Sequence, residues 1–446
     1  MRDLTRGPIA GHVAAMALPI AVGMLVQTLY YLVDLYFVSR LGGVAIAGVS
    51  AAGNLMFLVM ALTQMLSVGT MTAVSHAVGA DDRPRANLVF NQAVLLAGVL
   101  AAGALLGGYG GLGDLYIGAI SADASTAAAG TSYLRWFMPA MALQFAMTAM
   151  AAALQGTGIV KPTMIVQMLA VLVNIVLTPI LVAGWLTGQP MGVAGAGLAS
   201  SLAAATGLLL MTAYFVRLET YVGLHSRLLR PRFEVLENML RVGIPAGGEF
   251  ALMFVYMAVI YAVISGFGAT AQAGFGIGVR MMQAVFLPAL AIAFATPAIA
   301  GQNFGAKKAG RVRRTFRTAA LMNLVFMATL TLFCQWRPQW LVSSFTDDPE
   351  VLAVAATFMT VVSWNFVASG LTFNCSAMFQ GMGNTLPALA STATRLVTFV
   401  GPAFWLSRRP GFEIEHVWYL SVATVTVQAL VALALLRWQF RRRLQF

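Results

Sequence analysis

The amino-acid sequence predicts an all-α, polytopic membrane protein with twelve transmembrane helices in two six-helix bundles. Three observations predict this fold class: an apolar composition, twelve apolar segments of membrane-spanning length, and an internal repeat. Of 446 residues, 59% are hydrophobic and only 9% are charged, whereas roughly 25% of residues are charged in a soluble domain. Because so few polar residues can cover a water-facing surface, most of the chain must face lipid or other apolar helices.

The net charge and the cysteines exclude several other classes of protein. The formal charge of +12 does not indicate a nucleic-acid partner, because Lys and Arg cluster in short connections between apolar segments, where topology signals lie. The two cysteines, Cys334 and Cys375, give neither a disulfide framework nor a metal-ligand spacing. The first apolar segment is too long for the h-region of a cleaved signal peptide, so we expect an uncleaved signal anchor.

Twelve segments are long and apolar enough to span a membrane, which takes about 20 mainly apolar residues. They cover residues 12–38, 44–77, 87–111, 130–155, 163–187, 192–216, 241–265, 272–300, 316–335, 351–380, 386–407 and 416–437. Of the 27 Lys and Arg residues, twenty lie on one side of these spans, six lie on the other, and Arg395 lies inside a helix. This bias predicts that both termini are cytoplasmic, and we expect a bacterial inner-membrane protein.

Four landmarks recur in the two halves of the chain at a nearly constant separation. The pairs are Pro19 and Pro245, Gly79 and Gly305, Gln155 and Gln380, and Pro162 and Pro387. We therefore predict an N-terminal lobe over 1–217, a cytoplasmic basic linker over 218–240 and a C-terminal lobe over 241–446. Because each half has an even number of helices, the halves form a parallel repeat about a pseudo-two-fold axis along the membrane normal, as in many transporters.

Asp34 is the first candidate for a functional residue, because a charge near the bilayer centre costs between about 2.5 and 17 kcal/mol. It lies in the first predicted helix, after Pro19. A buried carboxylate there can carry a proton, or attract a sodium ion or a cationic drug; the alternative is a structural acid paired with a neighbouring helix. Pro19 frees a backbone carbonyl and bends its helix, so we predict a hinge there.

Several segments resemble the multidrug and toxic compound extrusion (MATE) family over nearly the whole chain. They are "ALPIAVGMLVQTLYYLVDLYFVSRLGGVAIAGVS" (17–50), "SVGTMTAVSHAVGADDRPRA" (67–86), "ALQGTGIVKPTM" (153–164), "VNIVLTPILVAG" (173–184), "GVAGAGLAS" (192–200), "VGIPAGG" (242–248), "AIAGQNFGAKKAGRVRR" (298–314) and "FQGMGNTLPAL" (379–389). The resemblance implies a secondary antiporter that exports organic cations against inward proton or sodium flow, with two six-helix bundles facing a central cleft. It also implies that Asp34 is the family's first-helix aspartate and Pro19 its kink-forming proline.

The residues that would surround Asp34 depart from the family pattern. In much of the family the fifth helix supplies an aspartate that pairs with the first-helix one, and the matching position here is Thr178, four residues after Asn174. We therefore predict that Asp34, Asn174 and Thr178 form an ion-coupling site. Within it, Asp34 and Asn174 are expected to be metal ligands only if the coupling ion is Na⁺.

Glu249 is the second buried acid of the sequence, four residues after Pro245. Some family branches carry a glutamate one turn later in this helix. We predict that Glu249 takes part in ion coupling or substrate attraction; the alternative is a structural pair with Arg395 or Arg280. The residues predicted to line a substrate cavity are Gln27, Tyr30, Tyr31, Asn54, Met253, Arg280 and Arg395.

The sequence predicts transport rather than catalysis. It has no GxxxxGKS/T phosphate loop and no H-E-x-x-H motif, so we expect no enzyme activity and no cofactor beyond H⁺ or Na⁺ as coupling ion. The leading hypothesis is an antiporter that exports cationic or amphipathic drugs by alternating access, with H⁺ slightly favoured. A flippase for a lipid-linked saccharide is the alternative, although two buried acids favour cationic cargo, and the repeat disfavours a non-transporting receptor. We expect a monomer in contact with membrane lipid.

Overall fold

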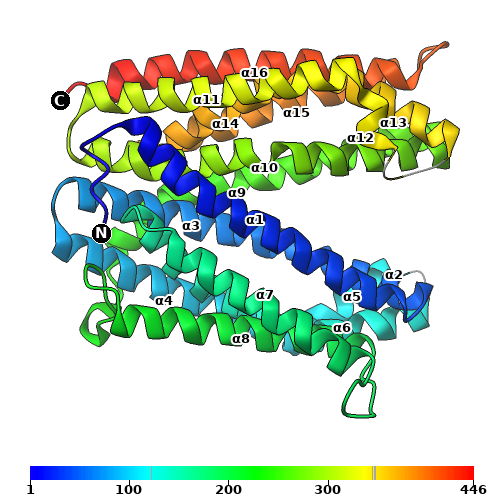
Figure 1. The fold of residues 1–446 in the computed structure, drawn as a ribbon, viewed down its shortest axis with the longest axis horizontal. Helices are drawn as coiled ribbons and strands as arrows, with labels where there is room; N and C mark the ends of the chain where they lie inside the picture. Colours follow the sequence, from blue (N-terminus) through cyan, green and yellow to red (C-terminus); the bar gives the residue numbers. More distant parts are fainter. Residues whose placement is uncertain (122, 344, 346–347) are drawn as a thin grey trace. The chain divides into compact units, whose positions relative to one another are not determined.

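The structure, a computed structural model, describes residues 1–121, 123–343, 345 and 348–446, and every regular element in them is a helix (Figure 1). The α-helices are α1 (Ile9–Ser39), α2 (Gly43–Gly53), α3 (Leu55–Gly79), α4 (Arg83–Gly107), α5 (Gly113–Ile120), α6 (Ala124–Gly156), α7 (Lys161–Val182), α8 (Val193–Arg217), α9 (Phe233–Ile264), α10 (Ala269–Gly305), α11 (Ala309–Trp336), α12 (Pro338–Val342), α13 (Pro349–Val362), α14 (Asn365–Gly381), α15 (Leu386–Leu406) and α16 (Ile414–Arg443). A π-helical turn, Gly108–Leu112, joins α4 to α5, and two short 3₁₀ turns cover Ser226–Leu229 and Ser265–Phe267.

All twelve predicted spans are helical, and the predicted all-α fold is confirmed. Within the described residues, ten helices are long and apolar enough to cross a membrane. An eleventh candidate is the pair α13 and α14, which is bent by 56° at its break. The twelfth predicted position is α15, a helix of 21 residues that does not qualify as an apolar span.

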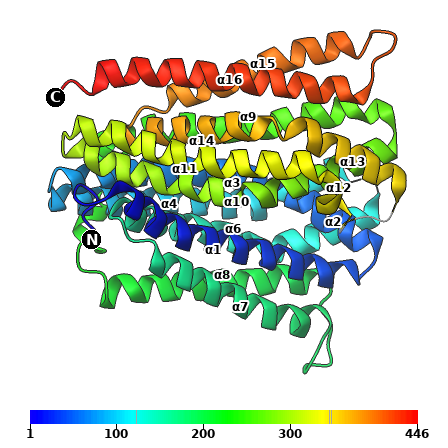
Figure 2. The same cartoon turned by 45° about the horizontal axis from the view of Figure 1, so that its top comes forward.

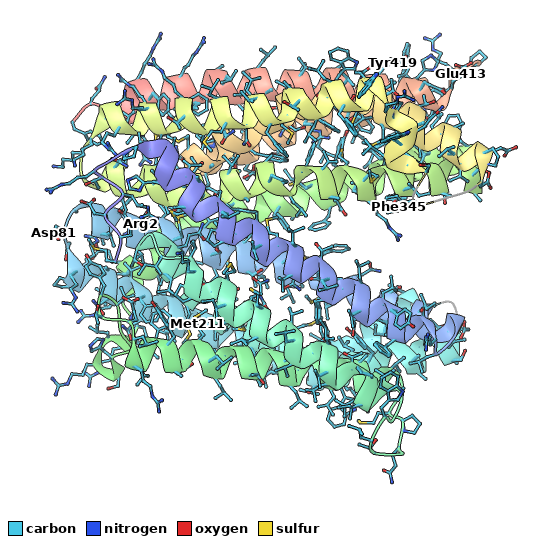
Figure 3. The ribbon with its side chains drawn as sticks, in the orientation of Figure 1. Arg2, Asp81, Met211, Phe345, Glu413 and Tyr419 are labelled. Atoms are coloured by element: carbon cyan, nitrogen blue, oxygen red, sulfur yellow. The ribbon has the colours of Figure 1, made fainter. Side chains whose placement is uncertain are left out.

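The outward faces of the helices are apolar, as expected for contact with lipid tails. In α8, Leu202, Leu209 and Val216 recur every seven residues and are 42%, 70% and 71% exposed. Met211 of the same helix is fully buried, whereas Tyr419 lies on the outer side of α16 (Figure 3). A soluble protein would cover such a continuous apolar stripe, and a membrane-spanning helix presents it to the bilayer.

Corresponding helices of the two halves begin with corresponding aspartates. Asp123 is the N-cap of α6 and accepts a hydrogen bond from the backbone N–H of Thr126 at 2.8 Å. Asp348, at the equivalent position of the second half, is the N-cap of α13 and accepts one from Glu350 at 2.9 Å. An N-cap carboxylate satisfies backbone donors that the first helical turn leaves unpaired. The repeat predicted from four landmarks therefore extends to the helix starts.

The chain divides into two compact units, and each is described by itself. Unit 1 comprises Met1–Asp3 and Val22–Gly247, and unit 2 comprises Leu4–Ala21 and Gly248–Phe446. The boundaries inside α1 and α9 follow Pro19 and Pro245 by two residues, so they lie at equivalent positions of the repeat. Packing thus groups the start of α1 with unit 2 and the start of α9 with unit 1. The two lobes and linker divided at 217 and 241 stay a prediction.

Within each unit, one long helix packs against several others. In unit 1, α6 contacts α2, α3, α4 and α8; in unit 2, α10 contacts α11, α13 and α14, and α16 lies against α14 and α15 (Figure 2). Gly197 of α8 allows the α6–α8 contact, because a Cβ atom there would lie 2.6 Å from the carbonyl oxygen of Tyr133. Small residues let membrane helices approach closely, and this approach brings α8 side chains to the site described next.

Candidate ion-coupling site

Helix α1 positions four of the predicted residues on neighbouring faces of unit 1. Tyr30 and Tyr31 lie three and four residues after Gln27 and four and three residues before Asp34, spacings that place side chains side by side along a helix. The Oε1 of Gln27 accepts a hydrogen bond at 2.9 Å from Gln167 of α7. This hydrogen bond fixes the face of α1 that turns toward α7.

Tyr30 forms a hydrogen bond with Ser200 of α8 at 2.7 Å. The Ser200 hydroxyl donates its only proton to the carbonyl oxygen of Ala196 at 3.1 Å, so Tyr30 is the donor to Ser200. The proton of the Tyr30 hydroxyl is therefore already used and cannot serve the carboxylate one turn along the helix.

Asp34 is only 9% exposed, and its Oδ1 atom has no hydrogen-bond partner in the part of the chain that the structure describes. Tyr30, Tyr31 and Tyr133 lie near this carboxylate. A buried acceptor without a partner costs about 1–3 kcal/mol, and more if it is charged. The alternative that Asp34 is a structural acid paired with a neighbouring helix finds no ion pair among the described residues.

Asn174 and Thr178 of α7 are both fully buried. The Thr178 hydroxyl donates to the backbone oxygen of Asn174 at 2.8 Å and lies 3.3 Å from its Oδ1. The Nδ2 of Asn174 has no partner within the described residues. Thus unit 1 contains an unpaired acceptor on Asp34 and an unpaired donor on Asn174, although no hydrogen bond joins them in the described part of the chain.

The equivalent positions in the second half of the repeat are apolar. The repeat relates Asp34 to Ile260, Asn174 to Phe399 and Thr178 to Ala403. Those three residues of unit 2 lie in a single hydrophobic cluster and are 5%, 0% and 1% exposed. These three positions are therefore buried in both halves, and they carry polar side chains only in unit 1.

Glu249 of α9 lies in unit 2 and has a different environment. The Ser376 hydroxyl of α14 is 2.9 Å from both carboxylate oxygens. Gln380, one turn further along α14, approaches the same hydroxyl at 3.5 Å. The alternative of an ion pair with Arg395 or Arg280 is not found in the described residues.

Arg395 stacks on an aromatic ring instead of pairing with an acid. Its guanidinium carbon lies 3.9 Å from the ring centroid of Tyr256, a cation–π contact. The Tyr256 hydroxyl lies 3.2 Å from the Ser421 hydroxyl, which also accepts from Asn365 at 3.2 Å. The Nε of Arg395 is buried and has no hydrogen-bond partner in the described part of the chain.

The remaining predicted residues are spread over both units. In unit 1, Tyr31 is 50% exposed and Asn54 is exposed between α2 and α3; in unit 2, Met253 is 44% exposed and Arg280 is exposed on α10. Pro19 lies inside α1, in unit 2. Tyr133, Gln167 and Ser200 were missed as members of the unit 1 site; polar residues inside apolar segments were the available signal for Gln167 and Ser200.

The duplicated, apolar helical fold indicates a polytopic membrane protein, and the buried Asp34 carboxylate, whose Oδ1 lacks a partner in the described residues, is typical of a secondary transporter. The MatE family model matches residues 19–180 and 245–405, so both matches begin at the repeated prolines. The chain belongs to the MATE family, whose members are transporters.

Relatives and solved structures agree with this membership. The chain is 25% identical over 398 residues to the probable multidrug resistance protein NorM of Thermotoga maritima, covering 89% of this chain and 83% of that protein. It is 24% identical over 399 residues to the multidrug export protein MepA of Staphylococcus aureus, covering 87% and 86%. A multidrug resistance MATE family transporter in an outward-facing conformation superimposes with a TM-score of 0.91 at 25% identity, over 99% of this chain and 98% of that one. The predicted fold class is thereby confirmed.

Proposed function

We propose that this chain is a secondary active antiporter that exports cationic or amphipathic drugs in exchange for H⁺ or Na⁺. Membership of the MATE family and the multidrug names of the relatives support this function. The observation that carries it is the buried Asp34 carboxylate, whose Oδ1 lacks a partner within the described residues. An intramembrane acid that no neighbouring residue neutralises is poised to bind a cation.

One carboxylate couples the two fluxes if the ion and the cargo compete for it. When the ion occupies Asp34, an organic cation loses its counter-charge and leaves; when the ion leaves, the carboxylate attracts the next cation. Tyr30 donates to Ser200 and therefore does not compete with an ion or a cargo for the carboxylate. The hinge at Pro19 would let α1 differ between the two states.

The donor set favours H⁺ over Na⁺ as the coupling ion. A sodium ion needs several oxygen ligands, whereas the buried atoms of this site without a partner in the described residues include the amide nitrogen of Asn174, which cannot bind Na⁺. The Asn174 oxygen already lies near the Thr178 hydroxyl. When Asp34 is ionised, it can accept a hydrogen bond from the Asn174 amide, and when it is protonated, it releases that amide. Proton coupling therefore needs no further ligand.

Dye efflux from proteoliposomes tests the proposal and selects the ion. With a proton gradient or a sodium gradient imposed separately, we expect the proton gradient to drive ethidium efflux. Asp34→Asn should abolish it, while Asp114→Asn, an exposed carboxylate in a surface pair with Arg135, should leave it unchanged. Efflux of wild-type rate from Asp34→Asn would refute the coupling role, and efflux driven by sodium alone would reverse the choice of ion.

Glu249→Gln separates the two buried acids. We expect partial efflux, because the amide oxygen of Gln can still accept a hydrogen bond from Ser376. Complete loss at normal protein levels would make Glu249 a second coupling residue.

We further propose that the protein works as a monomer in a bacterial inner membrane with both termini cytoplasmic.

A further inference from the structure

A surface that binds the basic linker in unit 1 has an unused counterpart in unit 2. In unit 1, Asn87 of α4 donates to the carbonyl of Tyr221 and accepts from the backbone of Gly223, both at 2.9 Å. Asn91, one turn along, donates to Gly223 at 2.9 Å and accepts from His225 at 2.8 Å. Two amide side chains thus hold the linker backbone against α4.

The equivalent positions of the repeat in unit 2 carry arginines. Asn87 corresponds to Arg313 and Asn91 to Arg317, and both arginines are exposed on α11. Neither has a hydrogen-bond or ion-pair partner in the described residues. The equivalent helix positions therefore bind the linker backbone in unit 1, whereas in unit 2 they carry positive charges that no described residue compensates.

Helix α16 adds more arginines beside them. Phe316 of α11 packs against Phe440 of α16 with ring centroids 6.1 Å apart, and both belong to one hydrophobic cluster. Arg317 directly follows Phe316 in the sequence, and Arg441 directly follows Phe440. We call Arg313, Arg317, Arg437 and Arg441 the arginine surface; all four are exposed, and no Asp or Glu occurs in residues 309–317 or 437–446.

The arginine surface lies where the helices change from polar to lipid-facing. One and two turns after Arg317, Leu321 and Val325 are 61% and 59% exposed. On α16, Trp438 is 46% exposed and lies under the guanidinium of Arg442, 4.7 Å from its ring centroid. Exposed tryptophan and arginine next to an apolar stripe mark the headgroup level of a bilayer.

We propose that the arginine surface binds the phosphate headgroup of an anionic phospholipid. Arginine forms paired hydrogen bonds with phosphate oxygens, and clusters of four or more basic residues beside a membrane helix attract anionic lipids. The acyl chains then lie along the exposed apolar faces below Arg317 and Arg437. This lipid takes the place that the linker backbone takes in unit 1, and the site is independent of transport.

The test measures lipid binding to purified protein in detergent, by native mass spectrometry and by the shift in thermal unfolding. Phosphatidylglycerol is the probe, and phosphatidylcholine and inorganic phosphate are the comparisons. The double variant Arg313→Asn with Arg317→Asn replaces both arginines by asparagine, the residue found at the equivalent positions of unit 1. Arg227→Asn with Arg230→Asn removes the same charge from the linker of unit 1, where both arginines lie outside the buried core.

Phosphatidylglycerol should bind the α11 variant about 25-fold more weakly than wild type, because each of the two arginines near an anionic surface contributes roughly fivefold. The linker variant should bind as wild type does. Arg313→Lys with Arg317→Lys keeps both charges but loses the paired hydrogen bonds, so it should bind more weakly than wild type and more tightly than the asparagine variant. Equal losses in the α11 and linker variants, no loss in either, a lysine variant as weak as the asparagine variant, or equal stabilisation by inorganic phosphate would each overturn the proposal.

Discussion

The two halves of the chain share a tyrosine–serine hydrogen bond and differ in the residues around it. Tyr30 bonds Ser200 in unit 1, and Tyr256, at the equivalent position of the repeat, bonds Ser421 in unit 2. Each bond joins the first long helix of a half to its last. Because it occurs in both halves, it is a packing element of the fold and not the feature that distinguishes an ion site.

The difference between the halves lies in the polar residues beside that bond. Where unit 1 has Asp34 and Asn174, unit 2 has the buried Ile260 and Phe399, and the Phe399 ring packs 4.9 Å from Tyr256. The fold therefore accepts apolar side chains at these positions. Polar groups kept there at the cost of unmade hydrogen bonds are best explained by function.

The largest expected effect follows from giving unit 1 the apolar character of unit 2. Asn174→Leu with Thr178→Ala removes an unpaired amide and a hydroxyl, so we expect thermal stability to rise by about 1–3 kcal/mol while ion-driven efflux falls to background. Thermal unfolding in detergent and dye efflux measure the two quantities. Asn238→Leu, at an exposed amide that donates to the Glu234 backbone within α9, is the control. A less stable variant with normal efflux would mean that these residues serve packing.

An intermediate effect distinguishes the two tyrosines. Tyr30→Leu loses one hydrogen bond, at about 1 kcal/mol, whereas Tyr256→Leu also loses the cation–π contact with Arg395, which contributes about 2 kcal/mol when desolvated. Unfolding midpoints should therefore fall further for Tyr256→Leu.

The phenylalanine variants are the matched controls for that difference. Tyr30→Phe and Tyr256→Phe each keep the ring and lose only the hydroxyl, so their midpoints should fall by similar amounts. If Tyr256→Leu were no worse than Tyr256→Phe, the stacked arginine would not stabilise unit 2.

Hydropathy was sufficient for the helices but not for how they break or pack. All twelve segments were predicted because each must satisfy its backbone inside an apolar phase. The 56° break between α13 and α14 has no proline at Ser363–Asn365, so no local signal marked it. The unit boundary inside α1 depends on contacts made by distant helices, which hydropathy does not report.

The candidate ion-coupling site was also only partly predictable from the sequence. Asp34 was predicted from the cost of an intramembrane charge, and Asn174 and Thr178 followed from the family resemblance. Tyr133 and Ser200 contribute from α6 and α8, and their approach depends on the rotation of those helices and on the close contact at Gly197. A single sequence gives helix periodicity, but it does not give the rotation of one helix against another.

The smallest expected effect concerns the N-caps that the halves share. Hydrogen bonds from the Ser125 hydroxyl, and from the backbone and hydroxyl of Thr126, lower the pKa of Asp123 from 3.8 to about 2. Because the folded-state pKa is depressed, the ionised cap contributes its full stability above about pH 4 and loses it as the pH falls through 2. Asp123→Ala should thus lower the unfolding midpoint slightly at pH 7 and match wild type near pH 2. A difference that persists at pH 2 would mean that Asp123 acts through something other than its charge.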